Sequence, residues 1–329
     1  MTQLKGDETV SKRPVLIIDA MNVYIRNFCV SPLMAEGQHV GGIIGFLRSL
    51  NLLIETHRPK ECVIVWEGGG SSRRRSIYPD YKGGRKPQKL NRFHDGDIPD
   101  SVDNKNWQVE ALIAALKNLP IRQLYISDCE ADDVIGYLSK YSYKDSRVVI
   151  VSSDHDYLQL VDNRINVWSP TLKSIVTEES VKERFGVLPH NLLVVRCFCG
   201  DASDNLQGVK GLGFKTMIKR FPDLASEKCV ELEDIIDYAS SMPEKSSNVY
   251  AQVKTNANLG RMNWKLMKLD VSNLSWNQVS KLNSALETQI PSCNKLSLSR
   301  TLLKCGIKTI DVDKLCLNSS INLKTVKSV

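Results

Sequence analysis

The sequence predicts an α/β fold with a mostly parallel central sheet that is covered by helices on both faces. Short, continuous apolar runs, as found in strands buried on both faces, recur along the chain. Segments with helical periodicity alternate with them, and this order favours parallel strands joined by right-handed crossovers. The 329 residues, 42% of them hydrophobic, suffice for one large α/β domain with an appendage or for two domains.

The first half of the chain supplies the expected sheet. Each strand is a compact run of Val, Ile, Leu or aromatic residues, and two of the strands are followed directly by an acidic residue, Asp19 and Glu67. The expected strands are 15–18, 62–66, 123–126, 147–151 and 165–168. The helices expected between them, from apolar residues at helical spacing, are 40–56, 107–119 and 134–141.

The second half reads as helical from residue 181 onward. The expected helices are 189–198, 217–221, 235–238, 249–267 and 278–286. The last residues, from Lys314, carry three lysines and no acid, so we expect a loose basic tail there.

Composition excludes several classes of protein. No run of eighteen apolar residues is present and residues 1–13 are polar, so we expect neither a membrane span nor a secretory signal. The nine cysteines are an odd number without the spacing of a disulfide framework or zinc ribbon, which is typical of reduced thiols in the cytoplasm. We therefore expect a cytoplasmic protein, and a monomer.

The positive charge is concentrated in one segment. The formal net charge is +7, and residues 71–92 alone hold eight basic residues against a single Asp80. This indicates a polyanionic partner such as nucleic acid. Because residues 71–106 lack a strong apolar period, we expect a long excursion from the core. Its basic residues are Arg73, Arg74, Arg75, Lys82, Arg85, Lys86, Lys89 and Arg92.

Three aromatic residues, Tyr78, Tyr81 and Phe93, interleave with these charges. The residues leave two interpretations open. The rings either pack incidentally, or they stack on a frayed base while Lys82 and Arg85 hold the phosphate.

Acidic residues gather where the expected elements end. In a mostly parallel sheet, ligands bind outside the carboxyl ends of the strands, so these side chains are expected to face one place. Asp128 is set apart as a helix N-cap. Any one of the others alone would more often be a turn residue or cap. The nine acids are Asp19, Glu67, Glu130, Asp132, Asp133, Asp154, Asp156, Asp201 and Asp204.

So many carboxylates in one site repel one another unless cations bind. No basic residue lies within these motifs, which speaks against a purely structural ion network. Oxygen ligands suit Mg²⁺ or Mn²⁺, and the lack of clustered Cys and His speaks against zinc. We expect two such ions, about 4 Å apart, which would activate a water and stabilise the leaving oxygen of a phosphodiester. His155 is expected to stand behind the ligands or to face phosphate.

A glycine-rich segment between two expected helices offers backbone N–H groups and lysines to a phosphate backbone, without reading bases. A segment of this kind alone could also be an ordinary loop. Its candidate nucleic-acid-binding residues are Gly208, Lys210, Gly211, Gly213, Lys215 and Thr216.

Six ordered motifs resemble the flap endonuclease and 5′-nuclease superfamily, within it the bacteriophage type that includes the T-even phage ribonuclease H. They are Asp19–Asn22, Tyr81–Arg85, Glu130–Asp133, Ser153–Asp156, Gly200–Asn205 and Gly208–Gly213. The resemblance implies a PIN-like nuclease domain at 14–190 with a helical arch or clamp inserted at about 71–106. It also implies a helical DNA-binding region at 191–313 that contains a helix-three-turn-helix at about 192–221, followed by the tail at 314–329.

The resemblance also implies roles for individual residues. Tyr81, Lys82 and Arg85 match the catalytic tyrosine, lysine and arginine of the arch, and the glycine turn would hold a monovalent cation such as K⁺. Glu67 departs from the family, which usually carries aspartate there, so this residue could contact a metal through water instead of directly.

The function predicted is a Mg²⁺-dependent 5′→3′ exonuclease and structure-specific flap endonuclease. As the resemblance implies, it would act on 5′ ends and flaps of DNA and on RNA–DNA hybrids, with ribonuclease H-type activity that removes replication primers, in the host cytoplasm if phage-encoded. A sliding clamp or single-strand-binding protein could be a partner. The alternatives are a PIN-type endoribonuclease on single-stranded RNA and a non-catalytic DNA junction-binding protein.

Overall fold

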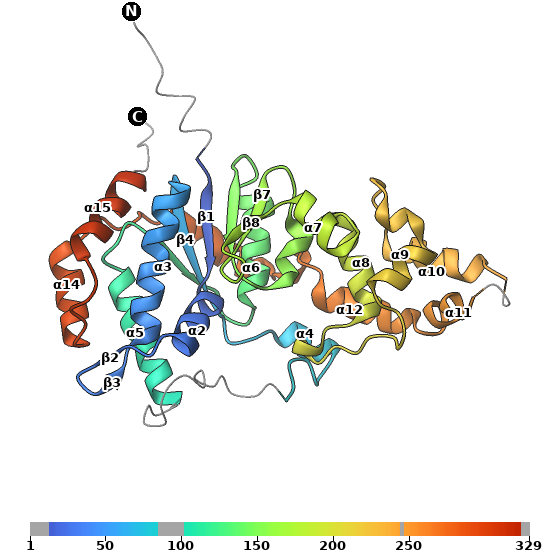
Figure 1. The fold of residues 1–329 in the computed structure, drawn as a ribbon, viewed down its shortest axis with the longest axis horizontal. Coiled ribbons are helices and arrows are strands. Elements are labelled where there is room, and N and C mark those ends of the chain that lie inside the picture. The colour runs from blue at the N-terminus through green and yellow to red at the C-terminus, as the bar shows by residue number, and fades with distance from the viewer. Residues whose placement is uncertain (1–12, 85–101, 244–246, 324–329) are drawn as a thin grey trace, which may run out of the picture.

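The computed structural model describes residues 13–84, 102–243 and 247–323. At its centre lies a six-stranded sheet in the order β5-β4-β1-β6-β7-β8 (Figure 1). Neighbouring strands are parallel except at the edge, where β8 is antiparallel to β7. All five expected strands are confirmed, and β8 is an addition. The strands are β1 (Val15–Asp19), β4 (Glu61–Trp66), β5 (Arg122–Tyr125), β6 (Val148–Val151), β7 (Ile165–Ser169) and β8 (Ser174–Val176).

The central strand β1 is buried on both faces, which explains its unbroken apolar run. Leu16 and Ile18 join a core cluster on one face of the sheet, and Val15 and Ile17 join a second cluster on the other. The first cluster is covered by α2 (Ala20–Val30), α3 (Gly41–His57) and α5 (Val102–Leu116). The second lies under α6 (Ala131–Tyr137), its π-helical extension η1 (Leu138–Ser142), the 3₁₀ turn η2 (His155–Leu160) and α7 (Glu178–Phe185).

The last two helices return to the sheet. α14 (Lys295–Lys304) packs on α5, and α15 (Val312–Asn322) packs on α3 (Figure 1). Leu302 and Leu315 are buried in the same core cluster as α3. The predicted loose tail was therefore wrong for 314–322, because the apolar face of α15 is buried; residues 324–329 lie outside the described part of the chain.

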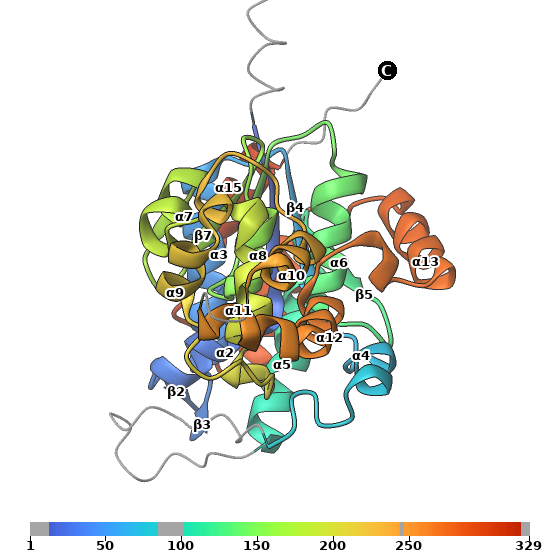
Figure 2. The same cartoon turned by 90° about the vertical axis from the view of Figure 1, so that its right-hand side faces the viewer.

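The helical region projects from the other end of the sheet, and the 90° view shows that α13 lies apart from it beside α6 (Figure 2). The expected helix 249–267 is in fact two helices that meet at Asn256. Small elements complete the chain, including the hairpin β2 (Met34–Ala35) and β3 (Gln38–His39) and the short helix α4 (Ser72–Ile77). The helices of the region are α8 (Pro189–Cys199), α9 (Phe214–Arg220), α10 (Leu232–Ser241), α11 (Asn248–Thr255) and α12 (Ala257–Met267), and α13 (Trp276–Glu287) follows them in the chain. Three 3₁₀ turns, η3 (Ala202–Asp204), η4 (Pro222–Ala225) and η5 (Val271–Asn273), connect them.

Among the described residues, no helix combines the length and the apolar character needed to cross a membrane.

Candidate active site

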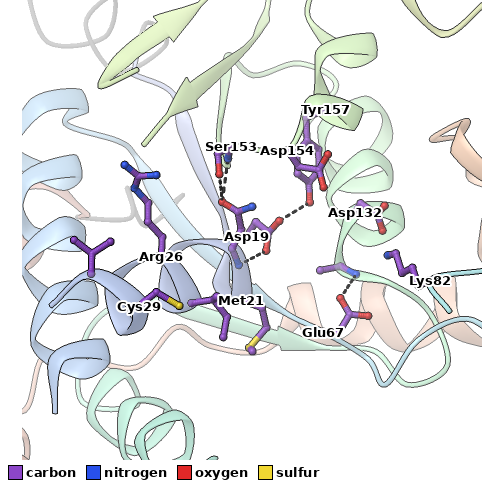
Figure 3. Close-up of a pocket in the computed structure, with 14 residues that line it drawn as sticks. Asp19, Met21, Arg26, Cys29, Glu67, Lys82, Asp132, Ser153, Asp154 and Tyr157 are labelled. Carbon is purple, nitrogen blue, oxygen red and sulfur yellow. Dashed lines mark hydrogen bonds between the residues drawn. The ribbon is translucent and has the colours of Figure 1, made fainter. Parts of the chain in front are cut away.

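A pocket of about 440 Å³ opens at the carboxyl ends of β1, β4 and β6 (Figure 3). Four of the nine predicted acids line it: Asp19, Glu67, Asp132 and Asp154. Asp19 is the last residue of β1, and Glu67 directly follows β4. Asp132 lies in the first turn of α6, and Asp154 is the N-cap residue of η2. The parallel sheet thus brings together residues from four separate segments, as expected from the strand ends. Other lining residues include Asn22, Arg26, Lys82, Ser153 and Tyr157.

Asp19 is fixed by its neighbours. Its carboxylate caps α2 by accepting a hydrogen bond from the backbone N–H of Asn22 at 3.1 Å, and it accepts others from the hydroxyls of Ser152 (3.2 Å) and Tyr157 (3.1 Å). Burial, together with the negative charge of Asp154, raises the pKa of Asp19 to about 6. A carboxylate held in one orientation and destabilised as an anion favours a bound cation.

Glu67 reaches the same pocket from the end of β4. It accepts a weak hydrogen bond, 3.4 Å, from the N–H of Ala131. Although the side chain keeps contact with solvent, partial desolvation in the pocket and the charges of Asp132 and Glu130 raise its pKa to about 7. Whether it contacts a metal directly stays a prediction.

The acidic turn before α6 differs from the expectation at its first residue. Glu130, not Asp128, is the N-cap residue of α6. Asp128 has a left-handed backbone (φ 57°) and accepts hydrogen bonds from the N–H and hydroxyl of Ser72, at 2.9 and 2.6 Å. It therefore fastens the start of α4 and stands outside the pocket.

Tyr81 and Lys82 meet the acidic turn from the opposite side. The hydroxyl of Tyr81 lies 3.0 Å from both Glu130 Oε2 and Asp204 Oδ2, and Nζ of Lys82 lies 2.6 Å from Glu130 Oε2. Tyr81 is only 8% exposed, so here its ring packs and its hydroxyl binds carboxylates, and it offers no face for base stacking. Tyr78 is half-buried against the same core, whereas Phe93 and Arg85 lie outside the described residues.

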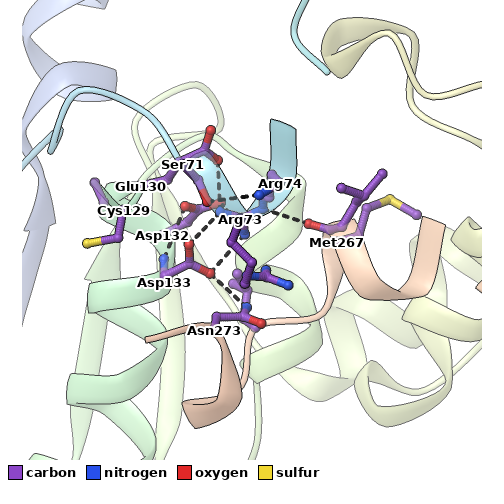
Figure 4. A network of polar contacts seen from close by, with 12 residues as sticks. Ser71, Arg73, Arg74, Cys129, Glu130, Asp132, Asp133, Met267 and Asn273 are labelled. Atoms are coloured by element: carbon purple, nitrogen blue, oxygen red, sulfur yellow. Dashed lines mark hydrogen bonds and ion pairs between the residues drawn. The ribbon is translucent and has the colours of Figure 1, made fainter. Parts of the chain in front are cut away.

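Arg74 was expected to meet nucleic acid and instead lies in the core of the site (Figure 4). It is 1% exposed and forms a two-pronged ion pair with Asp133, with Glu130 Oε2 3.1 Å away. Burial alone would lower the pKa of Arg74, but the charges of Asp132 and Asp133 raise it well above its ordinary value. The expectation that the acids have no basic partner was wrong, because this partner comes from a distant part of the sequence.

A second arginine holds the later acids. Arg196 of α8, also buried, forms ion pairs with Asp156 in η2 and with Asp201 just before η3, the latter at 2.5 Å. Asp133, Asp156 and Asp201 are thus paired with arginines and lie outside the pocket lining, whereas Glu130 and Asp204 contact Lys82 and Tyr81 at its edge. His155 is exposed beside Phe185 and does not line the pocket.

Within the described ranges, no three acidic, histidine or cysteine side chains are already arranged to hold a metal ion. The chemistry of the donors nevertheless fits one. Asp19, Glu67, Asp132 and Asp154 supply carboxylate oxygens, and Asn22 and Ser153 supply neutral polar groups. An all-oxygen set of this kind suits Mg²⁺ or Mn²⁺ and not zinc.

The predicted glycine turn joins α8 to α9. Gly208 allows close approach of two backbones, because a Cβ there would lie 1.9 Å from the carbonyl oxygen of Cys199. Gly211 has a positive φ of 86°, which favours glycine. Lys210 and Lys215 are exposed at this turn, as a phosphate-binding role requires, and Gly213 and Thr216 lie beside them.

The basic segment is less uniform than its composition suggests. Arg75 is exposed, but Arg73 is half-buried and donates to the carbonyl oxygen of Lys265 at 3.1 Å. Lys86 and Lys89 fall outside the described residues.

Several residues of the site were missed in the sequence. Asn22 and Ser153 belong to motifs in which only the acidic residues were predicted to act. The Ser153 hydroxyl donates a hydrogen bond of 2.8 Å to Asn22 Oδ1. Arg196 lies in an apolar helix, where a single charged residue on the buried face is the only available signal.

Comparisons with known proteins identify a family. The family described as "5′-3′ exonuclease, N-terminal resolvase-like domain" matches residues 14–186. A 5′-3′ exonuclease of Buchnera aphidicola subsp. Schizaphis graminum is 28% identical over 271 residues, which span 79% of this chain and 88% of that protein. Flap endonuclease Xni of Shewanella amazonensis is 28% identical over 256 residues, 78% of this chain and 92% of the other.

Among solved structures, the bacteriophage T5 flap endonuclease, crystallised with DNA and metal ions, superposes with a TM-score of 0.64. The match covers 89% of this chain and 98% of the other, with 18% identity. At that identity the likeness shows a shared fold.

Proposed function

Because the chain belongs to the 5′-3′ exonuclease and flap endonuclease family, we propose that it is a divalent-metal-dependent nuclease that cuts at 5′ ends and flaps of DNA and RNA–DNA duplexes. The observation that carries the proposal is the convergence of Asp19, Glu67, Asp132 and Asp154 on one pocket that also contains Lys82. Such a pocket is suited to a phosphodiester held between cations.

Two Mg²⁺ or Mn²⁺ ions fit the role of cofactor. Asp19, Asp132 and Asp154 would hold them, with Glu67 as a further ligand and Glu130 and Asp204 at the edge of the site. When bound, such ions activate a water and stabilise the leaving oxygen of a phosphodiester. Asp133, Asp156 and Asp201, expected as ligands in the sequence, act in this proposal through their arginine pairs.

The chain's own residues orient the reacting groups. Lys82 brings a positive charge to the pocket while its contact with Glu130 fixes its position. Tyr81 holds Glu130 and Asp204 in a fixed relation through one hydroxyl. Fixed donors and charges of this kind need no reorganisation when negative charge develops in the transition state.

The glycine turn would hold the duplex. Lys210 and Lys215 would bind phosphates on one strand away from the cut, which positions the duplex without reading its sequence. A K⁺ ion at this turn belongs to the same proposal. The T5 flap endonuclease, whose fold this chain shares, was crystallised with DNA and metal ions, which supports DNA as a substrate of the proposed nuclease.

Primer removal is the biological task that this substrate range supports. An RNA primer presents a 5′ end on an RNA–DNA hybrid, and a flap forms when it is displaced. Contact of the basic tail with a sliding clamp or a single-strand-binding protein remains a prediction, since residues 324–329 fall outside the described ranges.

A direct experiment offers the purified protein three 5′-labelled substrates: a flapped DNA duplex, an RNA–DNA hybrid and single-stranded RNA. With Mg²⁺, the first two are expected to be cut, and a chelator is expected to stop the reaction. Cutting of single-stranded RNA alone would support the PIN-type endoribonuclease instead. Binding of the flap without any product, while a control nuclease cuts it, would support the non-catalytic junction-binding protein.

A further inference from the structure

Residues 263–273, from the end of α12 through η5, form hydrogen bonds with the glycine turn, with α4, with η2 and with α6. We call this stretch the brace. It lies beyond residues 14–186 and in a part of the chain to which the sequence assigned no chemistry. Its own contacting groups are mainly neutral, namely backbone carbonyls and two asparagine side chains, although some of their partners are charged.

At its first end the brace holds the glycine turn. Asn263 is fully buried, and its amide group donates to the carbonyl oxygens of Cys197 (2.8 Å) and Gln207 (2.9 Å). Gln207 immediately precedes Gly208. The position of the glycine turn relative to α12 is therefore fixed by hydrogen bonds.

In its middle the brace holds α4 and η2. The carbonyl oxygen of Leu266 accepts from Nε of Arg74 at 2.8 Å, at the C-terminal end of α12 where carbonyls lack helical partners. Gln159, at the end of η2, donates to the carbonyl of Met267 and accepts from the N–H of Leu269, both at 3.0 Å. The same short stretch therefore holds both Arg74 and the segment that begins with Asp154 by hydrogen bonds.

At its last end the brace reaches the acidic turn. Asn273 donates from Nδ2 to Oδ1 of Asp133 at 2.7 Å and to the carbonyl of Lys268 at 2.5 Å. Oδ1 of Asp133 also accepts from Nη2 of Arg74 at 2.8 Å, so arginine and asparagine share one carboxylate oxygen (Figure 4). Asn273 therefore limits the directions in which the Arg74–Asp133 pair can turn.

We propose that the brace sets the distance between the glycine turn and the acidic turn, and that Asn273 is a positioning residue for the reaction, acting through Asp133 and Arg74 on Glu130 and Asp132. This inference rests on the proposed nuclease function. Arg74 lies within ion-pair distance of all three acids, at 3.1 Å from Glu130 and 3.8 Å from Asp132, so a turn of its guanidinium moves the charge that faces each of them.

The test compares Asn273→Asp with Asn277→Asp. Both changes replace a side-chain amide by a carboxylate, and the two positions are four residues apart. Asn277, however, is exposed on α13. In Asn273→Asp the donor to Asp133 is lost and a like charge faces it. Asn273→Ser, which removes the amide without adding charge, is the second variant if the first unfolds.

Three measurements are made on full-length protein. Residues that orient a metal ligand are typically worth roughly 10- to 100-fold in activity or metal affinity. Because Asn273 acts on Glu130 and Asp132 only through Asp133 and Arg74, we expect the low end of that range: in Asn273→Asp the single-turnover rate at saturating flap DNA and the Mn²⁺ affinity should each fall by about 10-fold. The dissociation constant for the same DNA without divalent ions should stay that of wild type. Hydrogen exchange should rise in peptides that cover 72–78 and 128–136. Asn277→Asp should match wild type throughout.

Each result has one meaning. Unchanged exchange at 72–78 and 128–136 would overturn the brace, and raised exchange with an unchanged cleavage rate would overturn the positioning role. A fall in DNA affinity equal to the fall in rate would also overturn it, because the residue would then act on binding. If wild type itself cuts nothing, the proposed function fails, while the exchange measurement still decides whether the brace exists.

Discussion

Nζ of Lys82 lies 2.6 Å from Oε2 of Glu130. This contact joins the basic segment 71–92 to the acidic turn before α6 and leaves the ammonium group at the wall of the pocket. Lys82 is therefore held where a phosphate would need a positive charge.

Replacing Lys82 by Met should leave folding intact and lower the cleavage rate by about 100-fold, as the loss of one fixed transition-state donor does in other enzymes. The rate is measured in single turnover on flap DNA. Lys182→Met, which removes an exposed lysine paired with Glu227, is the matched control. A Lys82→Met enzyme as fast as the control would show that the pocket does not use this charge.

Changing Tyr81 to Phe separates its two proposed roles. The structure predicts that the loss of the hydroxyl alone lowers unfolding free energy by about 1 kcal/mol and slows cleavage, because Glu130 and Asp204 lose a shared donor. Stacking on a base would instead tolerate Phe and fail with Leu. Urea unfolding and flap cleavage of Tyr81→Phe and Tyr81→Leu distinguish the two.

Removal of the buried Arg74 should be costly to stability. Arg74→Met leaves Asp133 unpaired in the interior, with an expected loss of about 3–5 kcal/mol in urea unfolding. The double variant Arg74→Met/Asp133→Leu should recover part of that loss, because no unpaired charge remains. An exposed, nucleic-acid-binding Arg74 would give a small stability change and no recovery.

Lys210 and Lys215 should each contribute to duplex binding through phosphate contacts. Each Ala substitution is expected to weaken binding of all duplex sequences alike and to reduce the slope of log affinity against log salt by about 1. Fluorescence anisotropy with Ca²⁺ over a salt series measures this. Lys182→Ala should keep the wild-type slope, and an unchanged slope in Lys210→Ala and Lys215→Ala would place the duplex elsewhere.

Metal binding should weaken as the pH falls. A hard cation binds the deprotonated carboxylate, so affinity decreases as the pH drops through the raised pKa of Glu67, about 7, and then that of Asp19, about 6. The stability of the metal-free protein depends on pH in the opposite direction. A raised folded-state pKa adds stability that is fully present below the unfolded value and is lost as the pH rises through about 6 to 7.

Calorimetric titration with Mn²⁺ and thermal unfolding without metal, each near pH 5 and near pH 8, test the two signs together. Asp19→Asn should remove the part of the pH dependence that lies around and below pH 6, and should leave the part near pH 7, which belongs to Glu67. Equal Mn²⁺ affinity at both pH values would contradict the assignment of these two acids as ligands.

The sheet and its acidic edge could be predicted because both depend on local pattern. A buried parallel strand reads as an unbroken apolar run, and an acid directly after it, such as Asp19 or Glu67, has to lie at the carboxyl edge. The order of the strands, which the structure supplies, places β6 next to β1 and so brings Asp154 near Asp19.

The pairing of the acids could not be predicted because it depends on distant segments. In the sequence Arg74 looks like its neighbours in a run of three arginines, and only the packing of α4 against the end of α12 buries it. Asn273 and Arg196 likewise stand in helices or turns without a motif. The helix α15 was mistaken for a tail, because its apolar face is short and is flanked by lysines.

The most direct test of the central claim is the cleavage of a 5′-labelled flap duplex by wild type and by Asp132→Asn, with Mg²⁺, after binding of both proteins to the same duplex has been measured with Ca²⁺. Asp132 lines the pocket, and among the described residues its cation contact is with Arg74 at 3.8 Å, beyond hydrogen-bond distance, so its replacement removes a ligand with little change in the fold. The account predicts that wild type cuts and that Asp132→Asn binds equally well and cuts at least about 100-fold more slowly. Equal cutting by the two proteins would contradict it.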